Sequence, residues 1–94
     1  MAEQKKHVAI RVYGKVQGVF FRASTLDKAR EFGLTGFVQN EDDGTVYLEA
    51  EGDEEALRKL EDWVHEGPKH ARVTRVDVKT VKELEGFEYF EQRR

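Results

Sequence analysis

The 94-residue sequence contains no cysteine, one proline and no long hydrophobic run. The absence of cysteine excludes disulfides, thiolate zinc sites and thiol nucleophiles. No segment approaches the roughly 18 consecutive apolar residues of a membrane span. The amino-terminal MAEQKKHVAIRVYG also lacks the apolar region and cleavage site of a secretory signal. We therefore expect a soluble cytoplasmic protein, and the length predicts a single domain over residues 1–94.

Two easily degraded residue types are scarce. Asparagine and methionine occur once each, beside 16 Lys and Arg and 19 Asp and Glu. Abundant charge with few thermolabile residues favours a heat-adapted, thermostable protein.

Acidic residues are missing from one stretch of the chain. Residues 4–26 contain no Asp or Glu but hold five cations, namely Lys5, Lys6, Arg11, Lys15 and Arg22. Because the whole chain has a formal charge of -3 and these five contribute +5, the remaining residues carry -8. An acidic protein is a poor general binder of nucleic acids. A positive region on such a protein favours a small anion over a long polyanion, although chance segregation of charge is the alternative at this point.

Hydrophobic periodicity predicts the first strand and helix. In VAIRVYG, Val8, Ile10 and Val12 alternate with the other residues as in a half-buried strand, which Gly14 ends. Residues 23, 26, 29 and 32 are then apolar at helical spacing, and Gly33 fits the position just beyond a helix.

The rest of the chain predicts four strands and a second helix. Residues 34–40 and 45–51 read as strands joined by the turn EDDG, which predicts a hairpin. Asp53 is a suitable N-cap for a helix that ends at Gly67-Pro68, and its buried stripe is Leu57, Leu60 and Val64 with Trp63 beside it. Residues 73–81 form a fourth expected strand and residues 87–90 a short one at a sheet edge.

This order of elements predicts an α+β fold. Strand–helix–strand–strand–helix–strand with right-handed crossovers is the ferredoxin-like βαββαβ two-layer sandwich. We expect an antiparallel sheet with two helices on one face and a short extra C-terminal strand.

The segment GKVQGVFFR at residues 14–22 combines three features of an anion site. Gly14 and Gly18 allow tight turns and close approach to a ligand. The segment leads into a helix N-terminus, where free N–H groups and the helix dipole favour an anion. Arg22 adds a planar, permanently charged fork at an end of the helix that otherwise disfavours a cation. A surface arginine directed away from the dipole is equally compatible with this local pattern.

The same segment resembles the first signature of the acylphosphatase family, Gly-x-Val-Gln-Gly-Val-x-aromatic-Arg. Every fixed position is met between Gly14 and Arg22. GFVQNEDDGTVYLEAEG is similar to the second signature, through Gly36, Phe37, Val38, Asn40, Gly44, Val46 and Gly52. The resemblance covers essentially the whole chain, and the family fold is the sandwich predicted above.

The resemblance implies an enzyme that hydrolyses the carboxyl–phosphate bond of acyl phosphates to a carboxylate and inorganic phosphate. It implies that Arg22 holds the phosphoryl group and Asn40 positions the attacking water, without a metal or cofactor. The backbone of seven loop residues would cradle the phosphate: Lys15, Val16, Gln17, Gly18, Val19, Phe20 and Phe21. Inorganic phosphate or sulfate would compete with the substrate, and we expect a monomer. Without the resemblance, an asparagine before a turn more often bonds its neighbouring backbone.

Other polar residues suggest weaker interpretations. His7, His65 and His70 match no metal-binding spacing and are expected to be solvated or partly buried structural residues. Asp42 and Asp43 belong to the expected turn. An RNA-recognition module shares the element order, but Glu49 and Glu51 on the outward face of a central strand would repel phosphates. A phosphate-binding domain without turnover is a second alternative, although such a domain has no need of Asn40.

Overall fold

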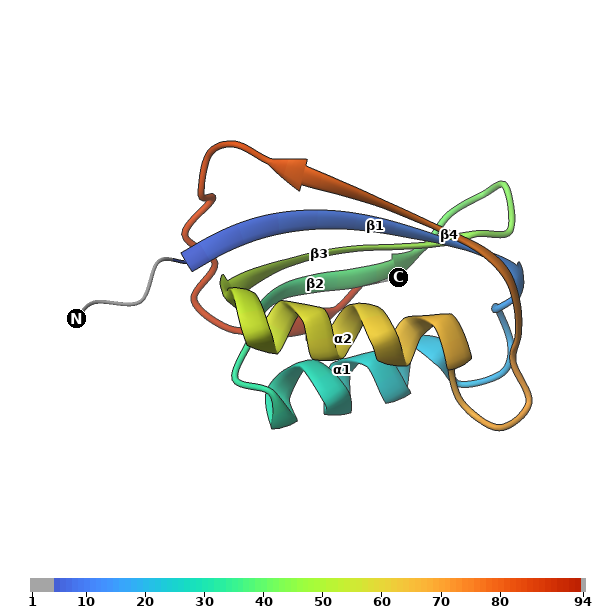
Figure 1. Ribbon diagram of the computed structural model, residues 1–94. Coiled ribbons are helices and arrows are strands. Elements are labelled where there is room, and N and C mark those ends of the chain that lie inside the picture. Colours follow the sequence, from blue (N-terminus) through green and yellow to red (C-terminus); the bar gives the residue numbers. More distant parts are fainter. Residues whose placement is uncertain (1–4, 94) are drawn as a thin grey trace.

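The computed structural model describes residues 5–93, which form two helices and five strands (Figure 1). The ends of the predicted domain over residues 1–94 lie outside the described residues. The elements follow in chain order: β1 (Lys5–Lys15), α1 (Phe21–Glu31), β2 (Thr35–Asn40), β3 (Val46–Asp53), α2 (Glu54–Glu66), β4 (Arg72–Val81) and β5 (Phe90–Gln92).

The strands make one sheet in the order β4-β1-β3-β2-β5. β1 pairs antiparallel with β3 and β4, and β2 pairs antiparallel with β3. Both helices lie on the same face of the sheet (Figure 1). The predicted ferredoxin-like sandwich, including its hairpin between the second and third strands, is therefore confirmed.

The core lies between the sheet and the two helices. Alternate residues of β1 and β3 supply its sheet side and are fully or almost fully buried: Val8, Ile10, Val12, Val46, Leu48 and Ala50. Leu57, Leu60 and Val64 of α2 are buried against them, as predicted. The alternation follows from the period of two along a strand.

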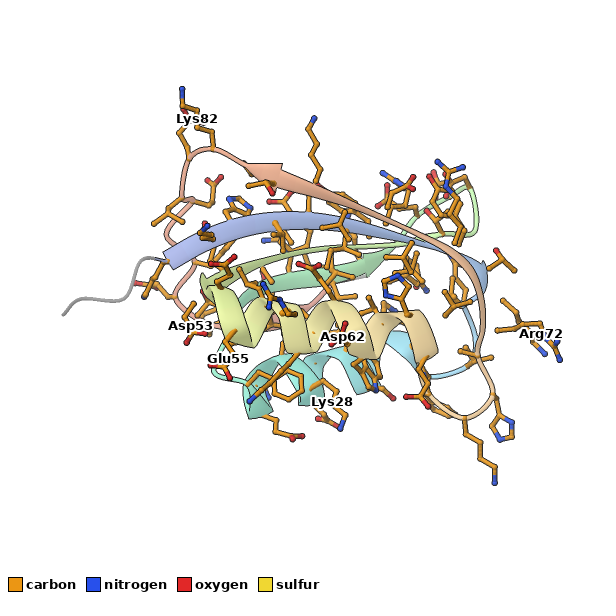
Figure 2. The ribbon with its side chains drawn as sticks, in the orientation of Figure 1. Lys28, Asp53, Glu55, Asp62, Arg72 and Lys82 are labelled. Carbon is orange, nitrogen blue, oxygen red and sulfur yellow. The ribbon has the colours of Figure 1, made fainter. Side chains whose placement is uncertain are left out.

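The ends of the helices follow the predicted capping chemistry. The Asp53 side chain accepts a hydrogen bond from the Ala56 N–H at 2.8 Å, and acidic residues occupy the first turn of α2 (Figure 2). At the end of α1, Gly33 has φ 74°, and the Leu34 N–H bonds the Ala29 carbonyl while the Gly33 N–H bonds the Arg30 carbonyl. This pair of backbone hydrogen bonds is the Schellman motif, which a glycine just beyond the end of a helix predicts.

Gly14 differs from the expectation. β1 does not end there but continues to Lys15 through an irregularity between Tyr13 and Gly14. Gly14 has φ 121°, and a Cβ at this position would collide with the Arg72 carbonyl oxygen on β4. Glycine is thus required for close packing of two strands, whereas the sequence suggested approach to a ligand.

The last strand also differs. The chain pairs with β2 over residues 90–92 instead of 87–90, and it pairs in parallel, so the complete sheet is mixed. The carboxylate of Glu51 accepts hydrogen bonds from the N–H groups of Glu85, Gly86 and Phe87. These bonds hold the start of the predicted strand as a loop, so strand pairing begins only at Phe90.

Candidate active site

The topology brings three strand ends and one helix start to the same edge of the sheet. Because β3 is antiparallel to both β1 and β2, those two strands run in the same direction, and β5 is parallel to β2. Their carboxyl ends therefore lie together, at the right of Figure 1, where the loop after β1 leads into α1.

A cavity of about 360 Å³ lies at this edge. Its lining residues are Val16, Gly18, Phe20, Phe21, Arg22, Ala23, Asn40 and Gln92. The structure therefore brings Arg22 and Asn40 to one cavity, although they belong to different elements and lie far apart in the sequence.

The cavity wall includes the N-terminus of α1. Phe20 is the N-cap, and the first helical hydrogen bond runs from the Ser24 N–H to the Phe20 carbonyl at 3.0 Å. The N–H groups of residues 20–23 consequently have no intrahelical acceptor, and all four residues line the cavity. The first turn contains no acidic residue that would occupy this positive end of the dipole. The arrangement is suited to an anion.

The loop before α1 has a backbone shape found at anion sites. Gly18 has φ 75° and Phe20 has φ 65°, while Val19 between them does not have a positive φ. When right-handed and left-handed backbone conformations alternate, successive N–H groups point into one concavity, and proteins commonly bind phosphate in this way.

Arg22 contributes charge and directionality to the cavity. Its Nη1 donates to the carbonyl oxygen of Arg93 at 2.7 Å. The Arg93 side chain is held in turn, because its guanidinium lies 3.9 Å from the centre of the Phe37 ring and its Nε donates to Glu91 at 2.8 Å. A guanidinium has five N–H donors, so the bond to Arg93 leaves others for a ligand.

Asn40 is the last residue of β2, and its backbone pairs with Val46. Within residues 5–93, the turn after it is tied by other side chains. Gln17 Nε2 donates to the carbonyls of Glu41 and Thr45 at 2.8 and 2.9 Å, and Asp43 accepts from the Thr45 N–H at 3.0 Å. The turn role expected of Asp43 is confirmed, and the Asn40 amide is not used to hold the turn.

Three residues of the predicted loop do not line the cavity. Lys15 is exposed at the end of β1 opposite Arg72, Val19 is buried in the core, and the Gln17 side chain reaches the turn between β2 and β3. Gln17 thus links the loop to the segment that follows Asn40.

Ala23 and two residues near the C-terminus also belong to the site, and the sequence pattern did not reveal them. Gln92 lines the cavity and the Arg93 carbonyl accepts from Arg22. Parallel pairing of the last strand with β2 carries this segment to the cavity. The only sequence signal was the short apolar run near residue 90, which did not show the direction of pairing.

A second cluster of ionisable groups lies on the sheet face opposite the helices. His7 is 3% exposed and lies between Glu49 and Glu51. Its Nδ1 contacts the Glu83 carbonyl at 2.9 Å and its Nε2 contacts Glu49 Oε1 at 2.8 Å. Since both neighbours are acceptors, both ring nitrogens donate only in the protonated imidazolium. The expected structural role of His7 holds, but its burial is nearly complete.

These contacts change two pKa values. Burial alone would lower the pKa of His7, but the bonds to Glu83 and Glu49 and the charges of Glu49 and Glu51 outweigh it, so the pKa is raised above 6.5. Burial and a hydrogen bond to Glu49 raise the pKa of Tyr47 to about 12. This face of the sheet therefore carries carboxylates and is partly covered by residues 83–87. Neither feature favours RNA binding.

The fold and the cavity together define a small α+β sandwich in which a helix N-terminus, an arginine and an asparagine line one cavity of a kind suited to an anion. Comparison with known proteins agrees with that class. The family model of the acylphosphatases matches residues 8–92. An acylphosphatase of Salinibacter ruber is 50% identical over 90 residues, which cover 96% of this chain and 95% of that protein. An acylphosphatase of Thermococcus kodakarensis is 52% identical over 81 residues, which cover 86% of this chain and 88% of that protein.

A solved structure gives the same result for the fold. The crystal structure of acylphosphatase from Bacillus subtilis superposes with a TM-score of 0.92 at 37% identity, covering 95% of this chain and 99% of that chain. This chain belongs to the acylphosphatase family. The resemblance found in the sequence is thereby confirmed.

Proposed function

We propose that this chain hydrolyses acyl phosphates at the cavity between α1 and β2, with Arg22 and Asn40 as its catalytic residues. The observation that carries the proposal is that Arg22, Asn40 and the free N–H groups of α1 line one cavity. Membership of the acylphosphatase family supports the reaction.

The phosphoryl group would occupy the positive end of α1. Backbone N–H groups of the cavity-lining residues of the loop, Gly18, Phe20 and Phe21, and the Arg22 fork would donate to its oxygens. Arg22 is already oriented by the Arg93 carbonyl, so less side-chain entropy is lost when the substrate binds. These donors stay in place as negative charge redistributes on the phosphoryl oxygens, which is the main requirement of phosphoryl transfer.

The leaving group needs no general acid. A carboxylic acid has a pKa of about 4, so the carboxylate departs as a stable anion at neutral pH. The bond between phosphorus and the acyl oxygen breaks, and its electron pair remains on the carboxylate. This accounts for catalysis without a histidine or carboxylate in the cavity lining, and the proposed steps use no metal.

Asn40 would orient the attacking water. An amide is not a useful base, but its carbonyl oxygen accepts a hydrogen bond. The water oxygen forms the new bond to phosphorus in line with the departing carboxylate. The water proton passes to a phosphoryl oxygen of the substrate, and the products are a carboxylate and inorganic phosphate.

The size and charge of the site support a small anionic substrate. Inorganic phosphate or sulfate would compete with it, and neither a nucleic acid nor a membrane is required. No helix within residues 5–93 is both long and apolar enough to cross a bilayer. We also propose that the protein acts in the cytoplasm as a thermostable monomer, which the lack of cysteine and the charge-rich composition support.

Variants of the two proposed catalytic residues test this function with acetyl phosphate as substrate. Arg22→Ala should abolish binding and turnover, and Arg22→Lys should also fail because a point charge does not reproduce the fork. Arg30→Lys is a matched control, since Arg30 on the same helix donates to the Phe90 carbonyl but does not line the cavity.

Asn40→Ala should lower kcat with little change in KM, because the water matters more in the transition state than in substrate binding. Near-normal turnover by Asn40→Ala would refute the water-positioning role. A chelator should leave the wild-type rate unchanged, and loss of activity on chelation would refute the metal-free mechanism.

A further inference from the structure

Phe20 is unusual among the residues of the cavity. It lines the cavity, yet its side chain is 76% exposed, so it stands at the opening to solvent. The neighbouring Phe21 is 1% exposed and belongs to the core. The first signature of the family leaves the position of Phe20 free, so the signature itself assigns this side chain no role.

Local rules disfavour phenylalanine at position 20. Its φ of 65° makes it the sole residue other than glycine with a positive φ among residues 5–93. A bulky residue is an outlier in that region of backbone space, where glycine and asparagine are preferred. The residue is also the N-cap of α1, and it makes no side-chain capping bond. Asparagine would satisfy both requirements.

Exposure of the ring costs further free energy without any contribution to the core. Strained, locally unfavourable residues cluster at functional sites because the constraint serves the function. A ring held at the opening of a substrate cavity, beside the phosphate-binding N–H groups, is placed to contact the part of the substrate outside the phosphate pocket.

The cavity has space for that part. The cavity volume is about 360 Å³. A phosphoryl group has four heavy atoms and the attacking water has one, so together they are much smaller than this cavity. Apolar residues line part of the cavity, among them the exposed Phe20 and the partly exposed Ala23.

We infer that Phe20 forms an apolar subsite for the acyl group and makes this enzyme prefer acyl phosphates with an aromatic acyl group. The inference rests on the proposed function of the cavity. With the phosphoryl group held at the N-terminus of α1, the acyl group extends towards solvent and meets the face or edge of the Phe20 ring. An aromatic acyl group gains a ring contact and apolar burial there, whereas an acetyl group is too small to gain much.

The test compares benzoyl phosphate with acetyl phosphate in wild type, Phe20→Ala and Phe20→Asn. Because the backbone at position 20 also borders the phosphate site, the informative quantity is the ratio of the two kcat/KM values, in which effects on phosphate binding cancel. We expect the ratio of benzoyl to acetyl phosphate to fall about tenfold in both variants, chiefly through KM for benzoyl phosphate. That corresponds to about 1.4 kcal/mol.

Phe20→Asn distinguishes the effect of losing the ring from any effect of a changed backbone conformation, since asparagine tolerates the left-handed conformation and can cap the helix. Tyr89→Ala is the control for loss of an exposed aromatic ring, because Tyr89 is 62% exposed and does not line this cavity. An unchanged ratio in both Phe20 variants, with both substrates still hydrolysed by wild type, would overturn the acyl subsite and leave the proposed function standing. If the wild-type protein hydrolysed neither benzoyl phosphate nor acetyl phosphate, the proposed function itself would be refuted.

Discussion

The side chain of Gln17 should couple the phosphate loop to the strand that carries Asn40. Its Nε2 donates to two carbonyls of the turn between β2 and β3, those of Glu41 and Thr45. Gln17→Ala removes both bonds. A typical net contribution is about 0.5–1.5 kcal/mol for each bond, which sets an upper limit of about 3 kcal/mol.

The structure places the expected loss below that limit. Each of the two carbonyls keeps a backbone partner, since the Gly44 N–H donates to the Glu41 carbonyl and the Glu41 N–H donates to the Thr45 carbonyl. Neither acceptor is therefore left without a hydrogen bond, and the large penalty for an orphaned buried group does not apply. We expect Gln17→Ala to lower the free energy of unfolding by about 1–2 kcal/mol.

The substitution should also slow catalysis. Without this link, the loop and Asn40 are free to shift relative to each other, and small misplacements of reacting groups cost large factors in rate. We expect kcat/KM for acetyl phosphate to fall by about tenfold or more, with the loss mainly in kcat.

Urea unfolding followed by the fluorescence of Trp63 measures the stability, because this single tryptophan packs 5.5 Å from the Phe21 ring. Steady-state kinetics measure the rate. Gln39→Ala is the matched control, since Gln39 also donates to Glu41 but only to its side chain, at 2.6 Å. If Gln17→Ala matched Gln39→Ala in both assays, the coupling role of Gln17 would be wrong.

Two further predictions concern stability. Because the folded-state pKa of His7 is raised above 6.5, the folded chain binds more protons than the unfolded chain; the stabilisation is complete below 6.5 and is lost as pH rises through the folded pKa. The difference in urea midpoint between wild type and His7→Gln should therefore shrink from pH 6 to pH 9, and a growing difference would contradict the protonated cluster. Gly36→Ala should cost about 3 kcal/mol or more, because φ is 143° and a Cβ would collide with the Glu49 carbonyl. Gly33→Ala, with φ 74° and open space, should cost only about 1–2 kcal/mol, and equal losses in the two variants would contradict this explanation.

Local signals in the sequence were sufficient for most of the fold. The alternation around Ile10, the capping aspartate at position 53 and the terminating Gly33 each act within one turn or one strand. Such features depend on neighbouring residues alone, so the pattern carries them directly.

Contacts between distant segments account for what the sequence did not show. The position of β5 depends on the capture of residues 85–87 by Glu51, more than thirty residues earlier in the chain. Gly14 is required by the approach of β4, which periodicity does not reveal. Consequently Gln92 and Arg93, which β5 carries to the cavity, were missed.

For the candidate site, the local pattern pointed to Arg22 as an anion ligand but left its direction open. The resemblance to a known family singled out Asn40, and the topology then placed both residues at one cavity because β1 and β2 end at the same edge. The exposed ring of Phe20 could not be predicted, since an aromatic residue beside a helix start usually indicates core packing.

The most direct test of the account is the rate at which the wild-type protein hydrolyses acetyl phosphate compared with a simple alkyl phosphate monoester. Both substrates offer a phosphoryl group to Arg22 and the N-terminus of α1, but only the first has a leaving group that departs as a stable anion without a general acid. We predict rapid release of phosphate from acetyl phosphate and no detectable release from the monoester. Comparable rates for the two substrates, or no hydrolysis of acetyl phosphate, would contradict the account.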